Sequence, residues 1–65
     1  MSKKNEPRFL DVPGVAQYLN ISERWVRRAV AERRIPFVKA GALLRFDRVE
    51  LDEWILGNTF WPERQ

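Results

Sequence analysis

The stretch of sequence from Asp11 to Val30 decides the fold, and it reads Asp-Val-Pro-Gly-Val-Ala-Gln-Tyr-Leu-Asn-Ile-Ser-Glu-Arg-Trp-Val-Arg-Arg-Ala-Val. Asp11 is a favourable N-cap, because its carboxylate can accept from the free backbone N–H groups of a first helical turn. The apolar residues after it have the i, i+3, i+4 and i+7 spacing of one helix face: Val12, Val15, Ala16 and Leu19. The first half of the stretch therefore predicts a short helix that buries one face.

A tight turn and a second helix are predicted from the residues that follow. Asn20 tolerates the left-handed conformation that ends many helices, and Ile21 is expected to fill the turn from the inside. Ser22 is a favourable N-cap, and the residues after it predict a second helix from Glu23 to about Arg33. The stretch as a whole predicts two helices joined by a tight turn.

The second helix has two chemically different sides. With residues 100° apart, as in an ideal helix, the arginines fall within an arc of about 100° and the apolar residues fall opposite them: Arg24, Arg27 and Arg28 on one side, Val26, Ala29 and Val30 on the other. Arginine combines charge with a planar fork that matches guanine and phosphate, so this side predicts a surface for a nucleic-acid groove. The alternative is an ordinary solvated charged face.

Three other side chains near this helix have two interpretations each. Trp25 lies about 100° from Arg24 around the helix, where its indole can pack over the following hairpin or lie against a sugar and a thymine methyl group. Arg33 and Arg34 can stabilise the carboxyl end of the helix through its dipole, or they can contact DNA. The sequence leaves both choices open.

The residues after the second helix predict a hairpin. Pro36 cannot continue a helix, and it biases Ile35 toward an extended conformation. The β-prone segments 37–39 and 43–46 flank Ala40-Gly41-Ala42, in which Gly41 is expected to supply an unusual backbone angle. We expect this hairpin to form a two-stranded wing beside the helices.

A third helix and a tail complete the chain. Asp47 with Glu50 three residues later resembles a capping box, and Gly57 is placed to end the helix. The tail contains the apolar group Phe60-Trp61-Pro62, which is expected either to fold back over the small core or to form a hook for a protein partner. The predicted inward stripe of the helix consists of Leu51, Trp54 and Ile55.

The composition excludes several classes of function. Sixty-five residues predict one small domain, and the absence of cysteine and histidine removes disulfides, thiolate sites and the commonest metal ligand and general base. No arrangement of the remaining carboxylates, lysines and hydroxyl groups suggests a reaction, so we expect no enzyme activity, no cofactor and no metal. Apolar runs are too short for a membrane span or a signal peptide, so we expect a protein of the bacterial cytoplasm with no membrane partner.

Charge is distributed unevenly along the chain, whose formal net charge is +3. Residues 22–34 carry five positive and two negative side chains, whereas residues 47–56 carry one positive and four negative. This pattern predicts a basic front and an acidic back, which would orient the molecule on a polyanion. We expect three regions: a flexible basic arm over residues 1–8, a domain over residues 9–57 and a tail over residues 58–65.

The order and spacing of these pieces resemble one known family. The most specific pieces are Ala16-x-x-Leu19-x-Ile21-Ser22, Ile35-Pro36, the spacing from Gly41 to Arg45, and Leu51-Asp52-Glu53-Trp54. Together they resemble the excisionase-type winged helix-turn-helix family, which is related to the MerR-type DNA-binding domains. The resemblance covers about residues 9 to 56. It implies a small α+β fold in which a helix-turn-helix is followed by a two-stranded hairpin wing and a third helix.

The resemblance also implies a function. It implies a recombination directionality factor of a bacteriophage or mobile element, which binds and bends double-stranded DNA in several adjacent, cooperating copies and directs a site-specific integrase toward excision. The residues it assigns to DNA are Arg24, Trp25, Arg27 and Arg28 in the groove, with Ser22, Lys39 and Arg45 on phosphates. The wing tip Ala40-Gly41-Ala42-Leu43 departs from relatives, which often carry Lys or Arg there.

Two other functions are compatible with the same residues. A small phage or plasmid transcription regulator can use the same domain, and the genes beside it would distinguish that role from excision. A protein-interaction adaptor could instead dock its basic face on an acidic partner and use Phe60 and Trp61 as an anchor. An adaptor would show no sequence preference among DNA duplexes.

Overall fold

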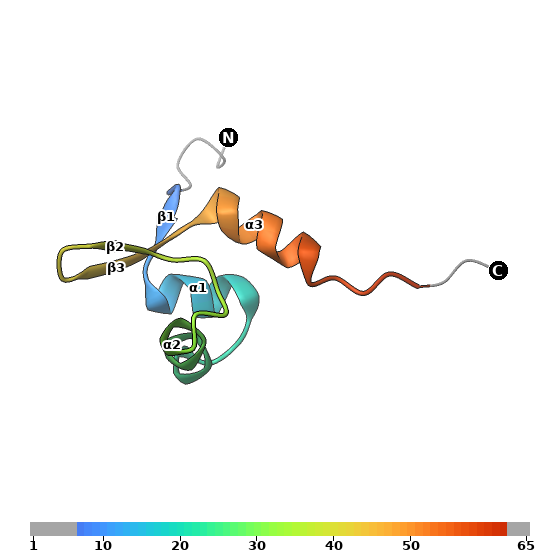
Figure 1. Cartoon of the computed structure of the whole chain (residues 1–65), viewed down its shortest axis with the longest axis horizontal. Coiled ribbons are helices and arrows are strands. Elements are labelled where there is room, and N and C mark those ends of the chain that lie inside the picture. The colour runs from blue at the N-terminus through green and yellow to red at the C-terminus, as the bar shows by residue number, and fades with distance from the viewer. Residues whose placement is uncertain (1–6, 63–65) are drawn as a thin grey trace.

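The computed structural model describes residues 7 to 62, which form three helices and three short strands. In chain order these are β1 (Phe9–Leu10), α1 (Val12–Leu19), α2 (Glu23–Ala31), β2 (Val38–Ala40), β3 (Leu43–Asp47) and α3 (Arg48–Gly57) (Figure 1). The tight turn joins α1 to α2, and the β2–β3 hairpin projects from the body of the molecule as a wing (Figure 1). The arrangement confirms the predicted small α+β fold of the winged helix-turn-helix type.

The beginnings of α1 and α2, and the end of α1, form as the sequence predicts. The Asp11 carboxylate accepts from the N–H of Gly14 (2.9 Å), and the Ser22 hydroxyl accepts from the N–H of Trp25 (3.1 Å). Asn20 ends α1 with a left-handed backbone, at a φ of 59°. Local caps therefore set where both helices of the turn begin, as expected for Asp and Ser at these positions.

The sheet has one strand more than the sequence analysis predicts. β3 is the central strand, and it pairs antiparallel with β2 on one side and with β1 on the other. In β1, Phe9 lies opposite Asp47 and Leu10 lies opposite Phe46. The predicted two-stranded wing is confirmed as the β2–β3 hairpin, and β1 is an additional strand that the sequence analysis did not predict. β1 has only two residues, which are too few to show the alternation by which a strand is identified.

α2 ends at Ala31, earlier than the predicted end near Arg33. Arg33 has a φ of 56°, and its N–H donates to the carbonyl of Val30 (3.0 Å). The N–H of Arg34 donates to the carbonyl of Ala29 (2.8 Å). The two bonds form a helix C-cap in which Arg33 is the residue with left-handed backbone. Glycine or asparagine usually occupies that left-handed position, so an arginine there gives no sequence signal that the helix stops.

α3 ends at Gly57, as predicted, but not through a left-handed glycine cap. Gly57 is the last residue of the helix, and the cap is Asn58, whose φ of −107° is not left-handed. The side-chain amide of Asn58 donates to the carbonyl of Trp54 (2.8 Å), and the Thr59 hydroxyl donates to the carbonyl of Ile55 (2.7 Å). Asn58 and Thr59 thus satisfy the last carbonyls of α3 with their side chains and their backbone N–H groups, and no glycine cap is needed.

One hydrophobic core joins the helix-turn-helix to the sheet and to α3. Its buried residues come from five segments: Val12, Val15, Ala16, Val26, Ala29, Ile35, Phe46 and Leu51. The predicted inward faces of the helices are confirmed, with Leu19, Val30, Trp54 and Ile55 packed against this core and partly exposed. Phe46 is fully buried and anchors the central strand, so the wing leaves the body from a fixed base.

The tail after α3 extends away from the body (Figure 1). Phe60 is 96% exposed and Trp61 is 71% exposed. The interpretation that these side chains fold back over the core is therefore wrong.

Candidate nucleic-acid interface

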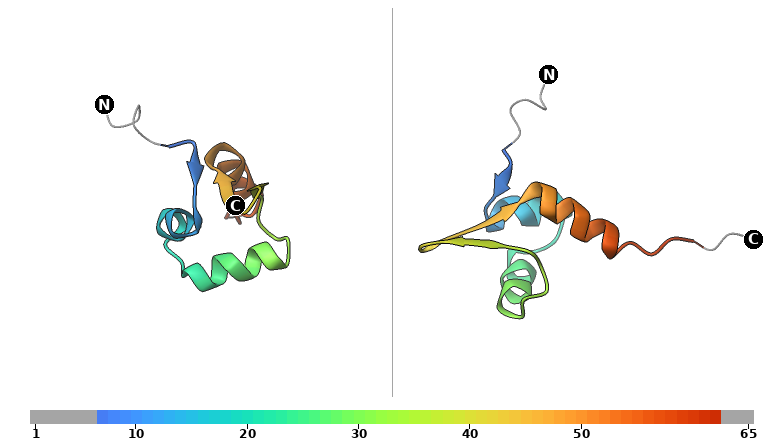
Figure 2. Two further views of the ribbon diagram at one scale, coloured as in Figure 1. Left: turned by 90° about the vertical axis from the view of Figure 1, so that its left-hand side faces the viewer. Right: turned by 45° about the horizontal axis from the view of Figure 1, so that its top comes forward.

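The outer face of α2 carries the predicted arginines. Val26 and Ala29 are buried on the inner side of the helix, whereas Arg24, Arg27 and Arg28 are exposed. Both views of Figure 2 place α2 at one end of the molecule, with α1, the sheet and α3 on the same side of it. The three arginines are thus exposed on the side of α2 opposite Val26 and Ala29.

The three arginines differ in how they are paired. Arg27 lies 3.5 Å from the carboxylate of Glu23, one turn earlier in α2, in an exposed pair. Arg24 and Arg28 form no ion pair with any residue between positions 7 and 62. Their charges are available to an anion, whereas Arg27 already shares part of its charge.

A shallow, open hollow lies at the beginning of α2. It has a volume of about 340 Å³ and is lined by Ser22, Arg24, Trp25 and Arg28. Four of the predicted DNA-contacting residues are thus brought together around one depression. The Ser22 hydroxyl is already engaged as the N-cap of α2, through its bond with the N–H of Trp25.

Trp25 has a neighbour that the sequence analysis did not assign to it. The guanidinium of Arg34, in the segment after α2, lies over the indole ring at 5.3 Å from the ring centroid. Arg34 also donates from Nε to the carboxylate of Glu32 (2.7 Å). No spacing rule pairs a residue in the first turn of a helix with one beyond its end, so nothing in the sequence could have shown this contact.

Lys39 and Arg45 lie on opposite faces of the wing. Lys39 stands opposite Leu44, which packs against the core, so Lys39 is on the face turned toward the helices. Arg45 stands opposite Val38, on the outer face, which it shares with the exposed Leu43. The Arg45 guanidinium donates to the backbone carbonyl of Leu44 (2.8 Å). The two predicted phosphate contacts of the wing therefore do not share a surface.

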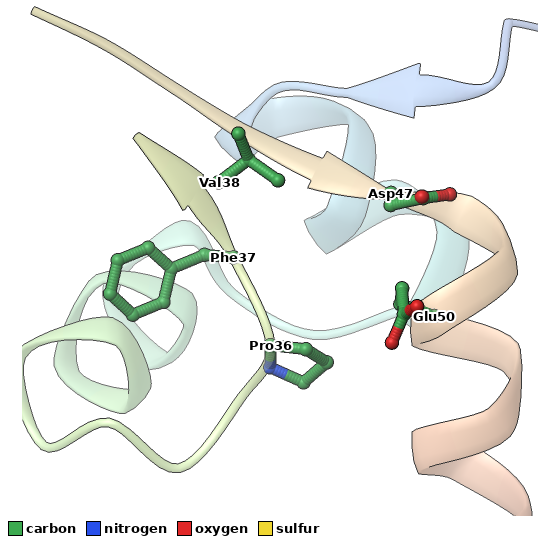
Figure 3. A pocket seen from close by; sticks show the side chains of 5 residues that line it. All are labelled: Pro36, Phe37, Val38, Asp47 and Glu50. Carbon is green, nitrogen blue, oxygen red and sulfur yellow. The ribbon is translucent and has the colours of Figure 1, made fainter. Parts of the chain in front are cut away.

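A second hollow of about 310 Å³ lies at the base of the wing. Its lining comes from the segment that enters β2 and from the junction of β3 with α3 (Figure 3): Pro36, Phe37, Val38, Asp47 and Glu50. Two carboxylates and apolar side chains make it unsuitable for a phosphate group, which would be repelled. The lining of this hollow therefore offers no cationic side chain to a phosphate, whereas the hollow at α2 is lined by two arginines.

Arg8 fixes the junction of β3 and α3. Its guanidinium donates from Nε to one carboxylate oxygen of Asp47 (3.2 Å) and from Nη2 to the other (3.0 Å). The hydrogen bond from Arg8 holds the pKa of Asp47 below its usual range, with further help from the N–H of Val49. The predicted basic arm lies outside the described residues at positions 1–6, and nothing in the sequence indicates that Arg8 reaches across 39 positions to Asp47.

Three acidic residues are carried by α3, which lies on the other side of the molecule from α2 (Figure 1). Glu50, Asp52 and Glu53 are exposed there, and Asp52 accepts a hydrogen bond from the Tyr18 hydroxyl of α1 (2.5 Å). Over residues 7–62, no group of three or more acidic side chains is placed to hold a metal ion. In the same part of the chain, no helix has the length and apolar character needed to cross a membrane.

Comparison with known proteins agrees with the fold. A family model described as a helix-turn-helix domain matches residues 9 to 59, which contain every helix and strand described above. No curated protein and no solved structure matches the chain significantly. The match indicates DNA binding, and it covers most of the sequence. The chain therefore belongs to the helix-turn-helix domain family.

Proposed function

We propose that this protein is a sequence-specific DNA-binding excisionase, which bends DNA and directs the integrase of a bacteriophage or mobile element toward excision. The observation that carries the proposal is the outer face of α2, where Arg24, Arg27 and Arg28 stand exposed opposite buried Val26 and Ala29. A helix of this kind enters the major groove with its N-terminal residues against the base edges. The protein itself contributes binding and geometry and no covalent chemistry.

The beginning of α2, the wing and α3 each support one orientation of the protein on the duplex, in which α2 faces the DNA and α3 faces away from it. The N-terminal part of α2 offers the hollow between Arg24, Trp25 and Arg28 to the bases. Lys39 stands on the wing face that is turned toward the helices, and we propose that it contacts the backbone beside the groove. The carboxylates of α3 lie on the other side, so repulsion from phosphate favours the same orientation (Figure 1).

The excisionase role rests on the sequence resemblance to that family, together with the small size of the domain. A single module of this size buries only about 600 to 1,000 Å² of protein surface on DNA, which gives little specificity by itself. Several copies on adjacent sites would supply the missing affinity and would bend the DNA between them. The exposed Phe60 and Trp61 offer an apolar hook for a protein partner, for which we propose the integrase.

The first test is binding to duplex DNA as a function of salt. With about five phosphate contacts and a slope of about 0.9 per contact, affinity should fall about 500-fold between about 50 and 200 mM salt. A nearly salt-independent affinity would contradict DNA binding. Gel shifts on the true site should give a ladder of complexes, and circular-permutation assays should show bending.

The second test separates excision from other uses of the same domain. The protein should leave a footprint in the attachment region of its element and should stimulate excision by the integrase encoded beside it. Trp61→Ala should reduce that stimulation while leaving DNA affinity unchanged, because the tail that carries it extends away from the body of the molecule (Figure 1). A footprint confined to a promoter, with no effect on excision, would assign the protein to transcription regulation.

A further inference from the structure

We infer that Arg34 is a positioning residue that holds the indole of Trp25 in place to contact the methyl group of a thymine, so that this pair of residues selects a T·A base pair. The inference rests on the proposed function, because it names a base read by the α2 surface. The observation behind it is the guanidinium of Arg34 lying 5.3 Å from the centroid of the Trp25 ring.

Trp25 is placed where a helix-turn-helix reads bases. It is the third residue of α2, and the N-terminal residues of a recognition helix approach the base edges. Trp25 is 37% exposed, so part of its surface remains open to a ligand even with the guanidinium of Arg34 over its ring. It lines the open hollow together with Arg24 and Arg28, whose charges would bring the DNA to it.

The chemistry of the indole points to thymine. Among the base edges of the major groove, only thymine presents an apolar group, its C5-methyl. The remaining positions present hydrogen-bond donors and acceptors, which suit Arg24 and Arg28 but not the carbon edge of an indole. An apolar side chain flanked by two arginines therefore fits a thymine next to a guanine or a phosphate.

The contacts of Arg34 favour a role in positioning Trp25 over a contact with phosphate. One carboxylate oxygen of Glu32 accepts from its Nε (2.7 Å), which offsets its charge. Its backbone is also fixed, because the carbonyl of Arg34 accepts from the indole N–H of Trp54 (3.0 Å). Trp54 packs against the core, so a continuous set of contacts leads from α3 through Arg34 to the ring of Trp25.

The experiment replaces thymine by deoxyuridine, which lacks only the methyl group. The probe is the tightest-binding duplex selected from a randomised library, with each thymine replaced in turn. Loss of one methyl from an apolar contact should weaken binding about fourfold at one position. Trp25→Ala should bind the thymine and deoxyuridine duplexes equally. If no single replacement weakens binding by more than the scatter of the series, the inference is wrong.

The role of Arg34 is tested with its neighbour as the matched control. Arg34→Gln and Arg33→Gln remove the same charge from the same segment, but only Arg34 lies over Trp25. Arg34→Gln should abolish the roughly fourfold preference for thymine over deoxyuridine while leaving the salt slope unchanged. Arg33→Gln should keep that preference. A lower salt slope with an intact thymine preference in Arg34→Gln would show a phosphate contact instead and would overturn the positioning role.

The outcome also distinguishes this inference from the proposed function. If the protein shows no preference among duplexes in the selection, the proposed DNA reading fails, and the inference fails with it. If it selects a sequence but tolerates deoxyuridine everywhere, only the inference fails. Thermal unfolding of each variant checks that the protein remains folded. A lost preference for thymine can then be assigned to the lost contact and not to unfolding.

Discussion

The outer face of α2 and the two faces of the wing carry positive charge in different ways. On α2, one side of a helix presents Arg24, Arg27 and Arg28, because Val26 and Ala29 hold the opposite side in the core. In the wing, neighbouring side chains alternate between faces, and Lys39 and Arg45 fall on opposite ones. A helix with one buried side can thus present several charged residues together on the opposite side. A hairpin does so only if its register allows it.

The largest effect is expected from the α2 arginines. Arg28→Ala should cost about 1 to 3 kcal/mol on the specific duplex and should relax the preference at one base pair, as for a bidentate base contact. Arg27→Ala should cost less, since Arg27 also pairs with Glu23 at 3.5 Å. Fluorescence anisotropy with specific and random duplexes measures both. If both variants leave the ratio of the two affinities unchanged, α2 is not the reading helix.

A smaller effect is expected from Gly41, which shapes the wing without touching α2. Its φ is +63°, and an added Cβ would meet nothing within 4 Å. Gly41→Ala should therefore lower the free energy of unfolding by about 1 to 2 kcal/mol through backbone strain alone. Gly41→Asn should lose less, since asparagine adopts this conformation more readily. Urea unfolding checks the order, and equal losses for both variants would contradict the strain explanation.

The next comparison separates the two faces of the wing. Lys39→Ala should weaken binding to specific and random DNA alike and reduce the salt slope by about 0.9, which is a three- to fourfold change between about 50 and 200 mM salt. Arg45→Ala is the charge-matched control, and it should leave the slope unchanged, because Arg45 lies on the outer face. An equal reduction by both variants would mean that the wing meets DNA with its edge and not with one face.

The smallest effect is expected at the base of the wing, from the exposed pair of Arg8 and Asp47. Since Arg8 lowers the pKa of Asp47, the pair contributes stability that is fully present above about pH 4 and is lost as the pH falls below it. Asp47→Asn keeps a helix cap but removes the charge. The difference in urea midpoint between the wild type and this variant should therefore shrink between pH 7 and about pH 3. A difference independent of pH would contradict an ionic contribution.

The sequence predicts α1, α2 and their turn well, because caps and helical spacing are local properties. Asp11, Asn20 and Ser22 have the predicted roles, and the buried side of α2 is the predicted one. The features that it misses are non-local. β1 is identified only by its pairing with β3, and the contact of Arg34 with Trp25 depends on how the chain turns back after α2. Periodicity within one segment carries no information about such contacts.

The order of the strands has a consequence for solubility. β2 is an edge strand of the described sheet, so the backbone groups along its outer side are open to pairing with a strand of another molecule. Its three residues are short, and the central one is Lys39. A lysine in the middle of an edge strand opposes aggregation, because a second copy in register would bring like charges together. One residue would then serve two purposes, holding the phosphate backbone when DNA is present and keeping free molecules apart when it is not.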